Sequence, residues 1–452
     1  MQLLGPPGNA SSRSSLGSGF NSGFNSGSDP GFTPKRCHRR TRWGIVRGVT
    51  SAVVTPAFRD TPARLAFQRN LLAVLIIFWG LATIGVLGVM RAGVKQTDRA
   101  MKQVSLVAET KVQLTRADSL ATSGYLTGGL QSDQALAAFA SDMASANTGL
   151  AAISRGVGGD KATATLGLIN TYLTDVTAAQ ANNRQGWPVG ATYQKTASTN
   201  LRTAILPSLD AVDTQARSDL VKSVQDLRWT WATASLFLLL VAIPLVLALF
   251  TLAAHSNRLV NLPVALALVV AFVAFIFTLT IANTTKKDTV NSIEFGFRNR
   301  DLVGQARVAA YNAKSNEALT LIARGSGRAY ELQWRQNMSD LEAIIADDRV
   351  SVDDMLKSAV EKYKALHAEV RQLDDAGEWD SARFGVLGAS GKASSLEFQA
   401  LDSALSARVP NDQTGPSAAR DLTVAQFIAG LAALVAAALT RVGFAQRLKE
   451  YQ

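Results

Sequence analysis

The chain has 452 residues, of which 47% are hydrophobic and only 18% are charged, and it contains a single cysteine. A soluble chain of this length normally divides into two or three domains and carries more charge. With one cysteine, no disulfide can form within the chain. The composition therefore argues against an ordinary soluble protein and against a disulfide-stabilised one.

Residues 1–60 are expected to form a disordered, basic, cytoplasmic tail. They begin with the Gly/Ser/Asn-rich stretch GNASSRSSLGSGFNSGFNSGSDPGF, whose composition cannot bury a hydrophobic core. The basic run KRCHRRTRWGIVR follows and favours contact with anionic lipid. The first apolar run comes too late for a cleavable signal peptide.

Four apolar segments are predicted to cross a membrane, at residues 61–92, 229–254, 262–283 and 421–440. The hydrocarbon core of a bilayer is about 30 Å thick, so a helix crosses it in about 20 residues. Each segment contains a charge-free apolar run close to that length. The fourth run is rich in alanine, and a buried core helix is the alternative there. The second and third spans are joined by a short hairpin, residues 255–261.

Lys and Arg indicate which side of the membrane each region occupies, because positively charged loops stay in the cytoplasm. Residues 1–69 contain ten basic and two acidic residues, residues 441–452 contain three and one, and the hairpin contains Arg258. Residues 93–228 have 13 basic and 11 acidic residues, and residues 284–420 have 18 and 20. We therefore expect a multi-pass protein of the cell membrane with both termini cytoplasmic and both long segments outside. The net charge of +11 then anchors the inner face and does not indicate a nucleic-acid partner.

The two outer segments have 136 and 137 residues, and each lies between two spans. Turn-forming clusters divide each into four helical pieces. These clusters lie at residues 124–129, 156–159 and 186–190 in the first segment, and at 325–327, 347–351 and 374–380 in the second. The similar lengths of the two segments and their division into four helical pieces each predict an internal duplication.

Four antiparallel helices with short loops can each bury one apolar stripe in a common core. From Thr61 and Pro62, a favourable helix start, nothing interrupts the first helix until Gly124. The predicted fold is therefore all-α, with four transmembrane helices and two extracytoplasmic four-helix bundles. The return to the fourth span, residues 409–421, contains two prolines and a glycine and is expected to be a loop.

The sequence does not predict a catalytic or metal site. Its three histidines, His38, His255 and His367, are too widely separated to suggest a metal cluster. Phosphate-binding, nucleophile-elbow and kinase motifs are absent from the sequence. The apolar runs also lack the ionisable residues of a pump or coupled transporter. We therefore expect a non-enzyme that needs no cofactor or metal and binds no nucleic acid.

Two outer helical domains joined by spans to a hairpin of a few residues are typical of a receptor that has no output domain of its own. Such a receptor passes a small helix movement through the lipid bilayer to a separate cytoplasmic partner, such as a serine/threonine kinase. The alternative is a membrane scaffold or transport-associated structural protein of the cell envelope. A scaffold needs neither a ligand pocket nor mobile spans. An oligomer is possible in either case.

The four spans, the two outer helical domains, the basic N-terminal segment and the ending GFAQRLKEYQ resemble the GlnX family of actinobacterial membrane proteins. The resemblance covers the whole chain in architecture, and residues 447–451 carry its most specific part. It implies a relay of extracellular acidic amino-acid availability. The implied partners are a lipid-anchored solute-binding protein for glutamate or aspartate outside and a soluble PknG-type serine/threonine kinase inside. The cytoplasmic partner is expected to contact Arg258, Arg447 and Tyr451.

Direct binding of an amino acid would need a guanidinium for its carboxylate and a carboxylate for its ammonium. Arg116 and Asp118 lie in the distal half of the first outer helix. Asn316 and Glu317 occupy the corresponding place in the second domain, with Arg324 two turns further on. Residues two apart on a helix point about 200° apart, so Arg116 and Asp118 can share a pocket only if it lies between helices. The alternative for all five is ordinary surface charge or a docking face for a binding protein.

Overall fold

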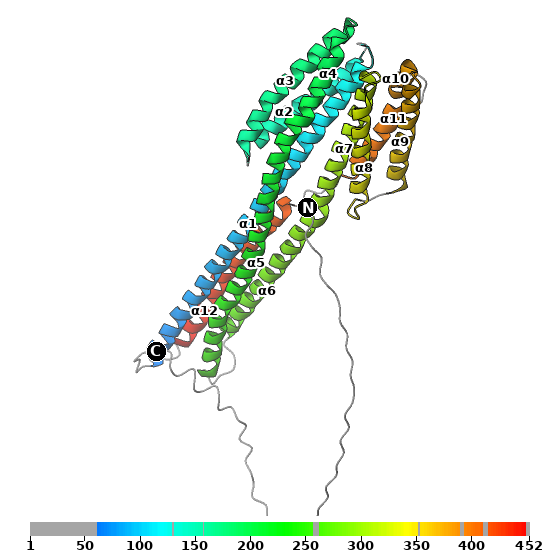
Figure 1. Cartoon of the computed structure of the whole chain (residues 1–452). Helices are drawn as coiled ribbons and strands as arrows, with labels where there is room; N and C mark the ends of the chain where they lie inside the picture. Colours follow the sequence, from blue (N-terminus) through cyan, green and yellow to red (C-terminus); the bar gives the residue numbers. More distant parts are fainter. Residues whose placement is uncertain are drawn as a thin grey trace, which may run out of the picture. The chain divides into compact units, whose positions relative to one another are not determined.

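A computed structural model describes residues 61–128, 131–156, 158–255, 262–350, 353–388, 393–409 and 415–448 (Figure 1). Every regular element in these ranges is helical, so the all-α prediction is confirmed for the described part of the chain. The elements are α1 (Thr61–Tyr125), α2 (Asp133–Ile153), α3 (Gly159–Arg184), α4 (Val189–Asn200), η1 (Leu201–Ile205), α5 (Leu206–His255), α6 (Leu262–Asn291), η2 (Ser292–Phe297), α7 (Arg298–Ile322), α8 (Arg328–Ile345), α9 (Asp354–Asp375), α10 (Trp379–Leu387), α11 (Ser394–Ser406) and α12 (Gly415–Leu448).

Helix α1 is one uninterrupted helix of 65 residues that begins at Thr61, as the sequence predicts. It ends at Tyr125, and Gly128 then takes a positive φ of 69°, a conformation that glycine adopts without steric cost. The predicted boundary between span and outer domain, at residues 92 and 93, therefore lies inside a continuous helix. Helix α12 likewise continues through the boundary at residues 420 and 421 and begins within the predicted loop, at Gly415.

Three helical segments are long and apolar enough to cross a membrane: Ala66–Tyr125, Leu262–Asn291 and Ala418–Gln446. They contain most of the first predicted span and all of the third and fourth. The second predicted span lies in α5, where most side chains beyond residue 233 are outside the described part. Large apolar side chains on the three segments point outward, and Phe78, Phe272 and Phe427 are 57%, 66% and 77% exposed. Contiguous apolar surface of this kind is suited to lipid and would be costly in water.

Helices α1, α6 and α12 run side by side and pack closely through small residues (Figure 1). A Cβ atom built on Gly80 would lie only 2.3 Å from the Cβ of Ala433, so α1 and α12 touch at a position where only glycine fits. Two turns before Ala433 on α12, Gln426 donates to the Ile84 carbonyl at 3.0 Å, and one turn after it Ala436 is fully buried. Small residues allow this approach, because van der Waals packing holds helices together in lipid.

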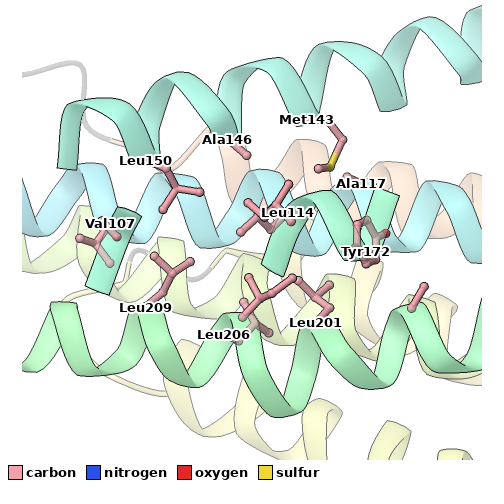
Figure 2. Packing of buried hydrophobic residues seen from close by; sticks show 14 of the residues in the cluster. Val107, Leu114, Ala117, Met143, Ala146, Leu150, Tyr172, Leu201, Leu206 and Leu209 are labelled. Carbon is pink, nitrogen blue, oxygen red and sulfur yellow. The ribbon is translucent and has the colours of Figure 1, made fainter. Parts of the chain in front are cut away.

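Helices α2, α3, α4 and η1, with the adjoining parts of α1 and α5, enclose one hydrophobic core, and we call them the first helical group. Figure 2 shows Met143 and Leu150 of α2 facing Leu114 of α1, with Leu201 of η1 on the opposite side. These side chains are buried, and each contributes about 1.5–3 kcal/mol relative to exposure.

Helices α7 to α11 form the second helical group. Residues of α7, α8, α9 and α11 enclose a separate core that Val112 of α1 also enters, and α10 packs on α7 and α9 in a further apolar cluster. Three aromatic rings pack near the centre of the separate core: Phe398 makes edge-to-face contacts with Tyr311 at 5.2 Å and with Tyr363 at 5.5 Å between centroids. The last helical piece is divided into α10 and α11, a break that the sequence analysis did not predict. It begins at Gly388, whose φ of 95° is in the left-handed region.

The two helical groups meet along α1 and α7. A Cβ atom on Gly304 of α7 would lie 3.7 Å from the Cβ of Ala108 on α1, an ordinary contact distance. Nearer the apolar segments, Arg217 of α5 binds both carboxylate oxygens of Asp301 on α7, at 2.7 and 2.6 Å. Because α1 and α5 continue into apolar stretches and α7 follows α6 and η2, this contact joins helices that belong to different predicted spans.

Candidate functional site at the junction of the helical groups

A buried carboxylate lies where the two groups meet. Asp118 on α1 is 1% exposed. It accepts hydrogen bonds from Ser198 at 2.7 Å, Ser315 at 2.5 Å, Arg202 at 3.1 Å and Tyr172 at 3.3 Å. The donors come from α4, α7, η1 and α3, and we call these five residues the Asp118 junction. One carboxylate thus connects elements from both helical groups.

Arg202 is held in place by an irregular turn of backbone. It lies in η1, a π-helical turn that joins α4 to α5 and ends two residues before Pro207. Proline has no N–H, and its ring clashes with the carbonyl four residues earlier, so an α-helical hydrogen bond cannot form there. Nη2 of Arg202 contacts both Asp118 and Ser315, the latter at 2.8 Å, and Nη1 donates to the Ser198 carbonyl at 3.2 Å.

The junction is electrostatically balanced within a largely water-free site. Arg202 is the counter-charge of Asp118, and charge-assisted hydrogen bonds of this kind are stronger than neutral ones. Burial raises the pKa of Tyr172 well above its usual value, and the neighbouring Asp118 carboxylate adds to this increase. Tyr172 therefore stays protonated and can only donate to Asp118. The arrangement stabilises one particular packing of α1 against α7.

Asn316 follows Ser315 on α7 and is fully buried. Neither its amide nitrogen nor its amide oxygen has a hydrogen-bond partner among the described residues, and the same holds for Gln194 on α4. Gln194 lies one helical turn before Ser198, a residue of the Asp118 junction, just as Ser198 lies one turn before Arg202. Two buried side-chain amides without a partner among the described residues therefore lie near the contact between the two helical groups.

Glu317 does not face the junction but lies inside the second helical group. It is fully buried and accepts from Lys314 at 2.5 Å and from Ser394 at 2.8 Å. His367 of α9 contacts Glu317 at 3.1 Å through Nδ1 and Glu331 of α8 at 3.0 Å through Nε2. We call Lys314, Glu317, Glu331, His367 and Ser394 the Glu317 cluster.

The geometry of the Glu317 cluster requires a charged imidazole, because each ring nitrogen faces a carboxylate and must donate to it. Burial lowers the pKa of His367, but its hydrogen bonds to Glu317 and Glu331 outweigh that effect and the pKa lies above its usual value. Burial raises the pKa of Glu317, while Lys314 and His367 outweigh it and bring the value to about 2. The ring of His367 also stacks on Trp334, with centroids 3.6 Å apart.

The remaining sequence-predicted residues lie apart from one another. Arg116 pairs with Asp142 of α2 at 3.4 Å, on a different side of α1 from the Asp118 junction. Arg324 follows α7 with a positive φ of 41° and lies over the Trp379 ring at 4.2 Å. Arg258, Tyr451 and the side chain of Arg447 lie outside the described residues, so the predicted cytoplasmic contacts stay predictions.

Sequence reasoning missed two residues that the geometry makes central. Arg202 is separated by 84 positions from Asp118, and no sequence pattern links them, although Pro207 signals an irregular turn nearby. In the sequence His367 is an isolated histidine, with nothing nearby that indicates its two carboxylate partners. In the described part of the chain, no group of three or more His, Cys, Asp and Glu residues is arranged to hold a metal ion.

Comparison with known families adds one finding. Residues 95–225 match the family model of the actinobacterial sensor domain. The matched segment runs from the outer part of α1 into α5 and contains four of the five residues of the Asp118 junction. It indicates a sensor-type protein. Searches of the curated proteins and of the solved structures gave no match.

Proposed function

We propose that the chain is an integral membrane sensor that passes an extracellular signal to a separate cytoplasmic partner, and that it is not itself an enzyme. In this proposal four spans and two duplicated outer four-helix bundles form a multi-pass protein of the cell membrane with cytoplasmic termini. Following the resemblance to the GlnX family, the signal is the availability of acidic amino acids. A solute-binding lipoprotein delivers it, and a serine/threonine kinase receives it.

The observation that carries the proposal is the continuity of α1. The same unbroken helix contains an apolar segment long enough to cross a membrane and the buried Asp118 carboxylate that connects the helical groups. A helix held at one end by a specific polar junction transmits a shift or rotation to its other end, because its backbone hydrogen bonds keep it rigid. The sensor-domain match over residues 95–225 supports the same interpretation.

The proposed topology predicts which sites an impermeant thiol reagent reaches. In a variant with Cys37 replaced by serine, Asp160→Cys and Glu378→Cys place exposed thiols in the two proposed outer regions. Both are expected to react in intact cells, whereas a cysteine at position 258 reacts only after permeabilisation. Protection of position 160 or 378 would contradict the four-span arrangement.

The proposed relay predicts a change in signalling without a change in transport. Cells that lack the protein are expected to lose the response of cytoplasmic protein phosphorylation to added glutamate or aspartate, while the uptake rates of both stay normal. Phosphoproteomics and radiolabelled uptake on the same cultures measure the two properties. Lost uptake with unchanged phosphorylation would replace the relay by a transport-associated scaffold.

A further inference from the structure

A cavity of about 450 Å³ lies between the two helical groups. One wall consists of Lys111 and Ala108 of α1 with Asp213 and Arg217 of α5. The other consists of residues from α7 and α8, among them Ala309. This volume is within the range of small-molecule sites in proteins, which is about 300–1,000 Å³.

Polar side chains lie at the opening of the cavity and along its walls, within a lining that is mostly apolar. Gln305 and Asp340 are exposed and lie where solvent can enter. Asn312 of α7 and Asn337 of α8 are half-buried and bring amide groups that can donate or accept hydrogen bonds. The α7 lining continues at helical spacing toward the unpartnered Asn316, one turn beyond Asn312.

The cations that line the cavity are already neutralised. Lys111 donates to Asp210 at 2.5 Å. Arg217 binds Asp301 through two nitrogens and donates from Nε to Asp213 at 2.9 Å. Among the described residues that line the cavity or pair with its lining, two cations therefore face four carboxylates, the fourth being Asp340.

Asp213 has one carboxylate oxygen in use and one free. Oδ2 accepts from Arg217, whereas Oδ1 is shielded from solvent and receives no hydrogen bond from any described residue. A buried carboxylate oxygen with no donor is costly, and an N–H donor that also brings positive charge offsets this cost best.

We propose that this cavity binds a small compound with a primary ammonium group and no net negative charge. In this proposal the Asp213 carboxylate, whose side chain is partly exposed, turns about its Cβ–Cγ bond so that the now shielded Oδ1 faces the cavity and accepts from the ammonium. The amides of Asn312 and Asn337 bind the rest of the molecule. The excess of carboxylates over cations around the site attracts cations and repels anions. The inference goes beyond the proposed relay and does not depend on it, because binding at the cavity requires neither a kinase nor a lipoprotein.

Occupancy would act on the contact between the groups. The cavity is bounded by α1 and α5 on one side and by α7 and α8 on the other, and the Arg217–Asp301 ion pair closes the contact beside it. A compound that bridges the two walls favours the arrangement in which they are held at this separation.

Isothermal titration calorimetry on the full chain in detergent micelles tests the proposal with four probes. Putrescine and L-lysine are expected to bind. L-Glutamate should bind at least tenfold more weakly than L-lysine, and succinate, which has no ammonium, should give no heat of binding. Absence of binding by both putrescine and L-lysine, or tighter binding of L-glutamate or succinate, would overturn the assignment.

Two variants and one matched control locate the binding. Asp213→Asn removes the charge but little volume, and it should weaken putrescine binding at least tenfold. Gly304→Leu leaves every ion pair in place and extends a side chain from the lining of the cavity, so it should abolish binding while helix content stays normal. Asp219→Asn, on the same helix and paired with Lys222, should bind like the unmodified chain. Unchanged binding by either cavity variant would refute the site.

Discussion

Asp118→Ala is expected to destabilise the chain by about 3 kcal/mol. The substitution leaves the Arg202 guanidinium largely buried without its counter-charge, and it removes the common acceptor of Ser198, Ser315 and Tyr172. Removing one partner of a buried ion pair costs about 3–5 kcal/mol, and the partial exposure of Arg202 favours the lower end. Thermal unfolding of the full chain, followed by circular dichroism, should show a decrease in melting temperature of about 4 °C, because the unfolding entropy of a chain of this length is large.

A control and a double variant separate this effect from the loss of any surface carboxylate. Asp98, also on α1, pairs with the exposed Lys102 one turn away, and Asp98→Ala should cost less than about 0.5 kcal/mol. Asp118→Ala combined with Arg202→Met removes both charges and should cost less than the sum of the two single changes. Additive losses would show that the two side chains do not stabilise each other.

The stability of the second helical group is expected to fall as the pH rises above about 6.5, the ordinary pKa of histidine. His367 has a raised pKa in the folded chain, so its stabilising contribution is complete below the unfolded value and disappears as the pH rises through the folded value. A neutral imidazole has a single N–H and keeps a hydrogen bond to only one of Glu317 and Glu331. Each unit by which the folded pKa exceeds the unfolded one contributes about 1.4 kcal/mol.

Melting temperatures between pH 6 and pH 9 measure this dependence. His367→Gln should flatten the profile over that window, because glutamine does not titrate. His255→Gln serves as the control and should retain the slope of the unmodified chain. Titration of the two carboxylates should not change the stability near neutral pH, since the pKa of Glu317 is about 2. Burial raises the pKa of Glu331, but His367 and then Arg335 outweigh it, so this pKa is also below its usual value. An unchanged slope in His367→Gln would exclude the histidine as its source.

Local sequence signals predicted the helices well. The start of α1 at Thr61 and its end near Gly124 follow from an N-terminal proline and a glycine cluster, whose effects on the backbone are local. The turns before α2, α3 and α4 also fall at the predicted clusters. The break at Gly388 was missed, because a lone glycine in a helical stretch does not say whether the chain will turn.

The candidate site could not be predicted to the same degree. Asp118 was selected, but its partner Arg202 lies on another helix, and only the packing of α1 against η1 and α7 brings the two together. The sequence presents Asn316 and Glu317 as neighbouring binding candidates, yet their side chains have different surroundings: Glu317 contacts α9, and Asn316 lies one residue after the junction contact of Ser315. Pairings between distant segments depend on tertiary packing, which a single sequence does not encode in any local pattern.

The unbroken course of α1 fixes a rotational phase between the membrane and the polar junction. At about 1.5 Å per residue its 65 residues extend about 98 Å, with no loop in which a change of length could be absorbed. One inserted residue between Gly80 and Asp118 would turn the junction by about 100° relative to the face that contacts α12, and Asp118 would then point away from Ser315. Seven inserted residues would restore the phase to within about 20°. The helix can therefore change its length only in steps close to a whole number of turns, such as about seven or eleven residues, if the same face is to lie against α12 at one end and α7 at the other.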